Sequence, residues 1–158
     1  MNEELFRSET YYALALDPIH IGVGGQRLSR VDLSIMRDPA TGIPKIPGTS
    51  LSGVARFYTA MKTPGKFLCA GKGGEGGEKH CGEGNPAACP VCVSYGFSKG
   101  SGFSIQGTAQ FFDAHIVFFP VATMAGPVWV TSPMALEGIT SEETFLPRMR
   151  LFILCLIA

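Results

Sequence analysis

Hydrophobic and polar positions in the first part of the chain predict a strand followed by a helix. Thr10–Leu16 is rich in β-forming residues and alanine and stops at Asp17-Pro18, which is typical of a central first strand. A helix is expected to begin at Thr49 or Ser50, where a hydroxyl can accept the free N–H groups of the first turn, and to end at Pro64-Gly65. Residues at helical spacing give this helix one apolar face, formed by Leu51, Val54, Ala55, Tyr58 and Met61.

The second half of the chain adds two strands and a less regular end. Gly107–Phe119 is a long apolar stretch broken by Pro120, and Val128–Val130 forms a shorter one. Strand, helix, strand, strand is the start of a βαββ unit, which predicts an α+β chain with a ferredoxin-like (RRM-like) core. The last helix and strand of that fold have no convincing sequence, although Leu136–Thr144 could form part of a helix. Phe145–Ala158 resembles an apolar tail without a partner.

Residues 64–99 have the composition of an insertion loop. Hydrophobic periodicity vanishes there, and seven glycines lie between Gly71 and Gly84. A loop with no core of its own needs another source of order, and four cysteine thiolates suit a closed tetrahedral site for structural zinc. A redox Cys-x-x-Cys pair or free thiols are the alternatives, although redox chemistry favours a helix N-terminus that follows a strand. The expected zinc ligands are Cys69, Cys81, Cys89 and Cys92, with His80 able to replace Cys81.

Composition and charge are those of a globular domain and narrow the possible partners. The 158 residues suit one domain, expected over residues 1–140, with an atypical tail over residues 141–158. Hydrophobic residues make up 46% and charged residues 16%, which argues against a disordered chain. The 13 basic and 13 acidic residues cancel, so nucleic-acid binding would need a local basic patch. We expect a cytoplasmic protein without membrane contact, because the start is acidic and no apolar segment reaches the ~20 residues of a membrane helix.

The stretch Pro18–Arg56 concentrates glycines and charges that a core could not use. Its glycines could bring backbone N–H groups close to phosphates, although a tight turn has the same composition. The helix start offers a second anion site through its free N–H groups, and ordinary capping is the alternative there. Asp32 is an isolated acid between apolar neighbours, and a loop or capping aspartate is its structural alternative. Five cations oppose two acids in this stretch: Arg27, Arg30, Arg37, Lys45 and Arg56 against Asp32 and Asp38.

Several segments of the chain, in the same order, resemble the RAMP superfamily (repeat-associated mysterious proteins). They are the PIHIGVGG turn, the VDLSIMRD segment, the TGIPKIPGTSLSG block, the FFDAHIVFFPV strand and VWVTSP. The similarity extends over roughly residues 10–135. It is strongest to the backbone subunit of type III CRISPR–Cas effectors, of the Cmr fourth-subunit or Csm third-subunit type.

This resemblance implies a subunit that binds guide CRISPR RNA, assembles with copies of itself and other effector subunits, and cleaves complementary target RNA in antiviral defence. Asp32 matches the family's cleaving aspartate, which works with a divalent cation, Mg or Mn. Zinc-binding insertions also occur in related RAMP proteins. The implied RNA contacts are His20, Gly22, Gly24, Gly25, Arg27, Arg30, Arg37, Thr49, Ser50 and Arg56.

The chain departs from this resemblance in length, because backbone subunits of the family are considerably longer. We therefore expect an incomplete domain, from a truncated or frame-disrupted gene, that lacks much of the thumb hairpin placed between guide and target bases. Two alternatives to an RNA-cleaving subunit follow. One is a non-catalytic RNA-binding scaffold, and the other is a zinc-stapled protein-interaction domain.

Overall fold

The computed structural model describes two compact units of the chain. The first, here called the sheet unit, comprises Met1–Pro47 and Phe112–Ala158, and the second, the cysteine unit, is Gly48–Phe111. Helices and strands occur together, so the fold class is α+β, as the order of predicted elements indicated. The described residues are 9–23, 34–71, 81, 85–98, 102, 104–140 and 150–154.

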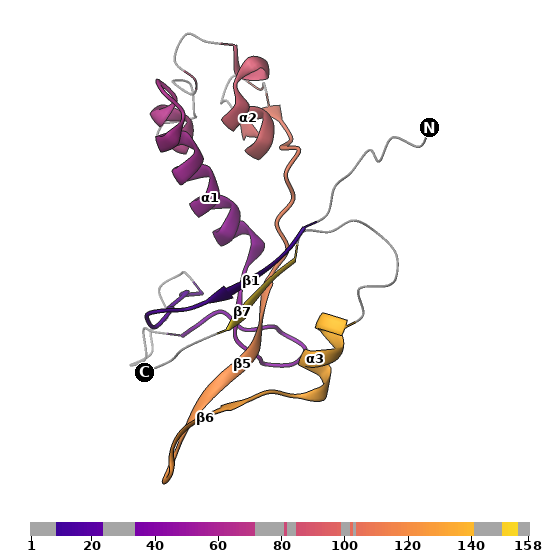
Figure 1. The fold of residues 1–158 in the computed structure, drawn as a ribbon. Coiled ribbons are helices and arrows are strands. Elements are labelled where there is room, and N and C mark those ends of the chain that lie inside the picture. Colours follow the sequence, from indigo (N-terminus) through magenta and orange to yellow (C-terminus); the bar gives the residue numbers. More distant parts are fainter. Residues whose placement is uncertain are drawn as a thin grey trace. The chain divides into compact units, whose positions relative to one another are not determined.

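A mixed β-sheet forms the centre of the sheet unit. β7 (Arg150–Leu154) lies between β1 (Thr10–Leu14) and β5 (Ala114–Thr123) and is parallel to both, as Figure 1 shows. β2 (Lys45–Ile46) pairs with β5 on its other side, and β6 (Gly126–Val130) pairs with the outer part of β5. Both of these pairings are antiparallel. Buried hydrophobic residues among the described positions of this unit are Ala15, Ala114 and Val117.

Strand β5 differs from the prediction at both ends. It begins at Ala114 rather than Gly107, and it continues through Pro120 to Thr123 instead of ending at that proline. Beyond Phe118, β5 pairs with β6 alone among the described strands, so the nitrogen of the proline can face the unpaired side. A proline in that orientation removes no hydrogen bond of the sheet, which is compatible with its place inside β5. The second predicted strand, β6, is confirmed and starts earlier, at Gly126.

Residues Arg150–Leu154 are paired, which corrects the expectation of an apolar tail without a partner. Helix α3 (Pro133–Thr140) begins before the predicted Leu136, and the Ser132 hydroxyl accepts a hydrogen bond of 3.2 Å from the N–H of Ala135. β7 then supplies a strand with a neighbour on each side. These neighbours provide partners for the backbone N–H and carbonyl groups of the strand.

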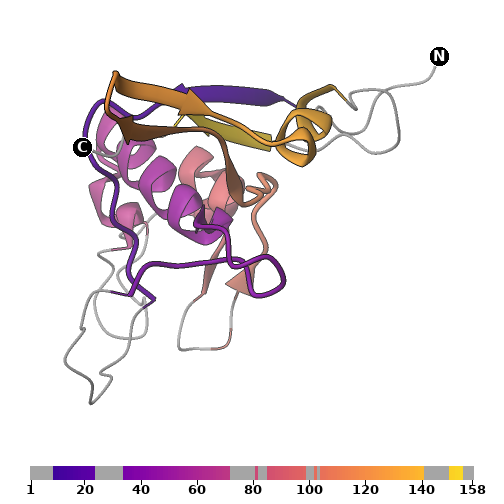
Figure 2. The same ribbon diagram turned by 90° about the horizontal axis from the view of Figure 1, so that it is seen from below.

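The described part of the cysteine unit is mostly helical. α1 (Gly48–Lys62) is followed by the 3-10 helices η1 (Phe67–Ala70) and η3 (Pro86–Ala88), and then by α2 (Pro90–Tyr95). The two α-helices lie next to each other, as Figure 2 shows. A short antiparallel pair follows them, made of β3 (Phe97–Ser98) and β4 (Ser104–Ile105).

Helix α1 begins at Gly48, one residue before the predicted Thr49, but the face that it buries is a different one. Val54, Tyr58 and Met61 of the predicted apolar face are exposed, at 55–59% of their full surface. Ala60 is buried instead, against the cysteines. Helical spacing identified a face without saying which partner would cover it, and a small alanine allows close contact with the cysteine-bearing segments.

Residues 64–99 contribute to a small core, although we expected a loop without one. The cysteines themselves are the largest part of this core, because their side chains occupy the space that aliphatic residues fill elsewhere. The thiols therefore have two roles in ordering this unit: they pack as buried side chains, and they can act as metal ligands. The buried cluster consists of Ala60, Cys69, Cys89, Val91, Cys92 and Phe97.

Candidate metal centre and flanking RNA-binding segments

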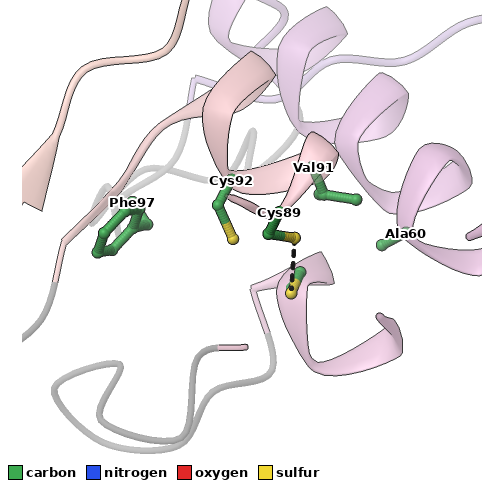
Figure 3. Close-up of a cluster of buried hydrophobic side chains, with 6 residues drawn as sticks. Ala60, Cys89, Val91, Cys92 and Phe97 are labelled. Atoms are coloured by element: carbon green, nitrogen blue, oxygen red, sulfur yellow. Dashed lines mark hydrogen bonds between the residues drawn. The ribbon is translucent and has the colours of Figure 1, made fainter. Parts of the chain in front are cut away.

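Four cysteines from three separate segments meet in the cysteine unit. Cys69 comes from η1, Cys81 from the segment after it, and Cys89 and Cys92 from the start of α2. Their Sγ atoms all lie within 4.8 Å of one another. The Sγ of Cys69 is 3.3 Å from that of Cys81 and 3.9 Å from that of Cys89, and the Cys81–Cys92 separation is 3.0 Å. Figure 3 shows the sulfur atoms of Cys89 and Cys92 beside Val91 and Phe97.

Local backbone structure places these thiols. Cys89 is the N-cap residue of α2, and Pro90 follows it at the first helical position, where its missing N–H costs nothing. The Cys89 carbonyl accepts the N–H of Val93 at 2.9 Å. Cys81 has a φ of +64°, in the left-handed region that a non-glycine residue adopts only when its surroundings require it. The backbone is thus arranged to turn the sulfur atoms toward one point.

Burial and mutual hydrogen bonding give the thiols different acidities. Burial raises the pKa of Cys81 to about 11, and burial likewise raises the pKa of Cys92. Burial also opposes ionisation of Cys89, but hydrogen bonds from the backbone of Cys92 and Val91 and from the neighbouring thiols bring its pKa down to about 7. Four thiolates in this space need a positive partner, because each new charge repels the others.

The residues present fit a metal ion with four sulfur ligands. A zinc ion with Zn–S bonds of about 2.3 Å requires neighbouring sulfur atoms to be about 3.8 Å apart. The Cys69–Cys89 separation of 3.9 Å meets this value, and the separations of 3.3 and 3.0 Å would have to open by less than 1 Å. The four side chains can therefore hold a metal such as zinc. The alternative ligand, His80, lies outside the described residues.

The redox alternative meets only part of its requirement. Cys89 and Cys92 do lie at the N-terminal end of a helix, but a 3-10 helix rather than a strand precedes it. The close approach of Cys69 and Cys81 is a feature of four-ligand metal sites that a redox pair does not need. The geometry favours the metal site.

A further layer of contacts joins the cysteine site to α1. The Nε of Arg56 donates a hydrogen bond of 2.7 Å to the carbonyl oxygen of Cys69. The hydroxyl groups of Thr59 and Tyr95 are 3.0 Å apart, and the ring of Tyr95 stacks on that of Phe111. The sequence predicted an RNA contact at Arg56 and carried no signal for its contact with Cys69, which depends on how α1 and η1 pack.

The described residues around the predicted catalytic segment form a paired frame. Gly22 and Ile35 form an antiparallel bridge, and the N–H of Val23 donates to the carbonyl of Ser34 at 3.2 Å. The N–H of Met36 donates to the carbonyl of Ile21 at 2.8 Å. The segment between these pairs carries the predicted positions Gly24, Gly25, Arg27, Arg30 and Asp32, all of which lie outside the described residues.

The Arg37-Asp38 turn is held by its own side chains. The Oδ1 of Asp38 accepts hydrogen bonds from the N–H groups of Ala40 and Thr41, both at 3.0 Å, and from the Thr41 hydroxyl at 3.1 Å. The hydrogen bond from the Thr41 N–H is the main reason why the pKa of Asp38 is lowered. Arg37, a predicted RNA contact, is exposed and donates from Nη1 to the carbonyl of Gly42 at 2.9 Å.

Lys45 connects this turn to the start of β5. Its Nζ lies 2.6 Å from the Oδ2 of Asp113 and 3.6 Å from the Oδ2 of Asp38, and only 16% of its side chain is exposed. The hydrogen bond with Asp113 is the main cause of the raised pKa of Lys45. The sequence suggested only that Lys45 belongs to a basic stretch, because Asp113 is far away along the chain.

The remaining predicted RNA contacts are divided between the two units. His20 and Gly22 belong to the sheet unit and are exposed, as Arg37 is. Thr49 and Ser50 lie in the first turn of α1, in the cysteine unit. No helix in the described part of the chain has the length and apolar character needed to cross a membrane.

Comparison with known proteins identifies a family that the chain matches. The family model of the RAMP superfamily matches residues 13–143, which include the whole cysteine unit and part of the sheet unit. No curated protein and no solved structure matched the chain. The matched range includes the cysteine site, the paired frame around residues 24–33 and the Arg37-Asp38 turn. Because this match extends over most of the 158 residues, the chain belongs to the RAMP superfamily.

Proposed function

We propose that this chain is a guide-RNA-binding backbone subunit of a type III CRISPR effector and that it cleaves complementary target RNA through Asp32. Membership of the RAMP superfamily indicates a CRISPR-associated RNA-binding subunit that works with CRISPR RNA and other effector subunits. The assignment to the Cmr or Csm backbone type, the ferredoxin-like core and the self-association are parts of the proposal. The family match over residues 13–143 is the observation that carries it.

Charge distribution supports RNA binding more clearly within the units than across the whole chain. The cysteine unit contains six Lys and Arg residues against three Asp and Glu, whereas the sheet unit has seven against ten. A phosphate backbone is attracted by such a local surplus, and the resulting affinity falls as salt rises. We therefore expect guide RNA to contact the cysteine unit as well as the glycine-rich segment around Gly22.

Cleavage would use Asp32 close to the attacking 2′-hydroxyl of the target. A carboxylate there can accept the proton of the hydroxyl or hold a cation beside the phosphate. A divalent cation, Mg or Mn, would supply positive charge for the phosphate oxygens when it is bound. The paired frame of Gly22, Val23, Ser34 and Ile35 supports this role, because it places ordered backbone on each side of the segment that carries Asp32.

The cleavage proposal is tested with the reconstituted effector, a radiolabelled complementary RNA and the variant Asp32→Ala. We expect cutting to be lost while guide-RNA binding stays at the wild-type level. Asp17→Ala is the matched control, because Asp17 is an exposed aspartate just after β1 and should cut normally. Equal cutting by Asp32→Ala and wild type would refute Asp32 as the catalyst. Guide binding without any cutting by the wild-type complex would favour the non-catalytic scaffold.

We also propose that zinc occupies the four-cysteine site as a structural ion. Three buried thiols and the half-buried Cys81 support this assignment, with sulfur separations of 3.0, 3.3 and 3.9 Å. Metal analysis of the purified full chain, with and without dialysis against a chelator, tests it. A folded chain that contains no zinc would contradict the proposal.

The third alternative, a zinc-stapled protein-interaction domain, is tested by the salt dependence of guide-RNA binding. Binding that does not depend on salt would favour that alternative over an RNA-binding subunit.

A further inference from the structure

Arg56 contacts the backbone of a cysteine ligand rather than its sulfur. Its Nε donates to the carbonyl oxygen of Cys69 at 2.7 Å, and Arg56 is partly buried on α1, one turn before the buried Ala60. Hydrogen bonds from a guanidinium are roughly twice as strong as those between neutral groups. The contact therefore fixes the peptide group of Cys69 more firmly than an ordinary backbone hydrogen bond would.

We propose that Arg56 is a positioning residue of the metal site, which orients Cys69 and stabilises the negative charge of the metal–thiolate centre. The Sγ of Cys69 lies within 4 Å of the sulfur atoms of both Cys81 and Cys89. Holding the Cys69 peptide thus holds the thiol that links two of the other ligands. This inference rests on the zinc occupancy proposed above.

The charge of the centre gives the second reason. Four thiolates around one divalent cation leave a net charge of about −2 in a largely buried space. A guanidinium keeps its charge at every pH that a protein tolerates and is more weakly hydrated than an ammonium group. Arg56 can therefore remain charged beside the site at a lower desolvation cost than lysine.

Helix α1 contacts two of the segments that carry ligands. Arg56 bonds to η1, which carries Cys69, and Thr59 on the same helix contacts Tyr95 at the end of α2, which carries Cys92. η1 has only four residues, and 3-10 helices of this length have poor hydrogen-bond geometry of their own. η1 thus depends on α1 for its position, and the hydrogen bond from Arg56 Nε to the Cys69 carbonyl joins the two helices.

The test measures zinc affinity of the full-length chain by competition with a chromophoric chelator. Residues that support a metal ligand typically contribute 10–100-fold to metal affinity, so Arg56→Met should weaken zinc binding by about that factor. Arg56→Lys should lie between Arg56→Met and wild type, since it keeps the charge and loses the planar donor. Lys62→Met is the matched control, because Lys62 is an exposed cation at the end of the same helix and its replacement removes an equal charge. Its zinc affinity should remain within about twofold of wild type.

A spectroscopic readout separates positioning from general loss of fold. With cobalt in place of zinc, the thiolate-to-metal absorption should change in Arg56→Met and stay unchanged in Lys62→Met. Wild-type zinc affinity in Arg56→Met would overturn the role of Arg56 and leave the metal site standing. An equal loss of zinc affinity in Lys62→Met would do the same. Failure of the wild-type chain to bind zinc would overturn this inference together with the metal site. If Arg56→Met does not fold, Arg56→Lys decides, and wild-type affinity in that variant would refute the need for the guanidinium.

Discussion

Gly107 lies where two backbone segments of the cysteine unit cross, and its replacement by alanine is a sharp test of how that unit is built. A β-carbon at Gly107 would lie 2.6 Å from the carbonyl oxygen of Ser94 and 2.6 Å from the carbonyl carbon of Tyr95. Both atoms belong to the backbone at the end of α2, so no side chain can move aside. The segment would have to withdraw as a whole.

The structure sets the size of the effect. Ordinary contacts of a β-carbon begin near 3.4 Å, so the segments must separate by about 0.8 Å. Two backbone hydrogen bonds join them, from Thr108 N–H to the Val93 carbonyl at 3.0 Å and from Ala109 N–H to the Ser94 carbonyl at 2.9 Å. That shift would take both beyond hydrogen-bonding distance. Losing them costs about 0.5–1.5 kcal/mol each and overpacking about 1–3 kcal/mol, which gives a destabilisation of about 2–6 kcal/mol.

The assay is denaturant unfolding of the full chain at saturating zinc, followed by far-ultraviolet circular dichroism. Gly53→Ala is the matched control, because Gly53 lies inside α1 and its added β-carbon would meet nothing within 4 Å. That variant should gain about 0.5–1 kcal/mol from the greater helix propensity of alanine. The same substitution should thus act with opposite signs at Gly107 and Gly53.

An unfolding midpoint of Gly107→Ala equal to that of wild type would refute the close crossing of the two segments. A loss of stability in Gly53→Ala as large as in Gly107→Ala would also count against the reasoning. In that case alanine would be harmful throughout the unit for a reason other than the contact with α2.

Two further predictions concern the metal site and the charged turn. Cys92→Ser should abolish stoichiometric zinc binding and unfold the cysteine unit, because structural zinc contributes about 10–16 kcal/mol to the folding of small zinc peptides. Elemental analysis after dialysis measures the zinc content, and a variant that retains zinc would contradict the prediction. The pKa of Asp38 is lowered in the folded state, chiefly by the Thr41 N–H. Its carboxylate therefore stabilises the sheet unit at pH values above the pKa of the unfolded state, about 3.9, and this contribution is lost as pH falls through the lower pKa of the folded state. Asp38→Asn should therefore flatten the acid side of a plot of unfolding midpoint against pH, and an unchanged slope would show that this carboxylate has no such role.

Local patterns in the sequence predicted the parts that depend on neighbouring residues. β1 was predicted from its β-forming residues, and the start of α1 was predicted to within one residue, although Thr49 and Ser50 lie inside the helix and not before it. The four cysteines were identified by residue type and spacing, and the structure brings them together. The catalytic assignment of Asp32 remains a prediction, because that residue lies outside the described part.

The sequence by itself determined the family, because its motifs resemble those of the RAMP superfamily in the same order. It also determined the α+β class and the residues able to bind a metal, because these follow from local periodicity, turn residues and ligand chemistry. Only the tertiary structure decided that the apolar run at Arg150–Leu154 is a strand between β1 and β5, and that Ala60 rather than Tyr58 is buried. It also decided the partners of Arg56 and Lys45. Each of these depends on groups distant along the chain, and the free energy of such contacts exists only once the segments that carry them have packed together.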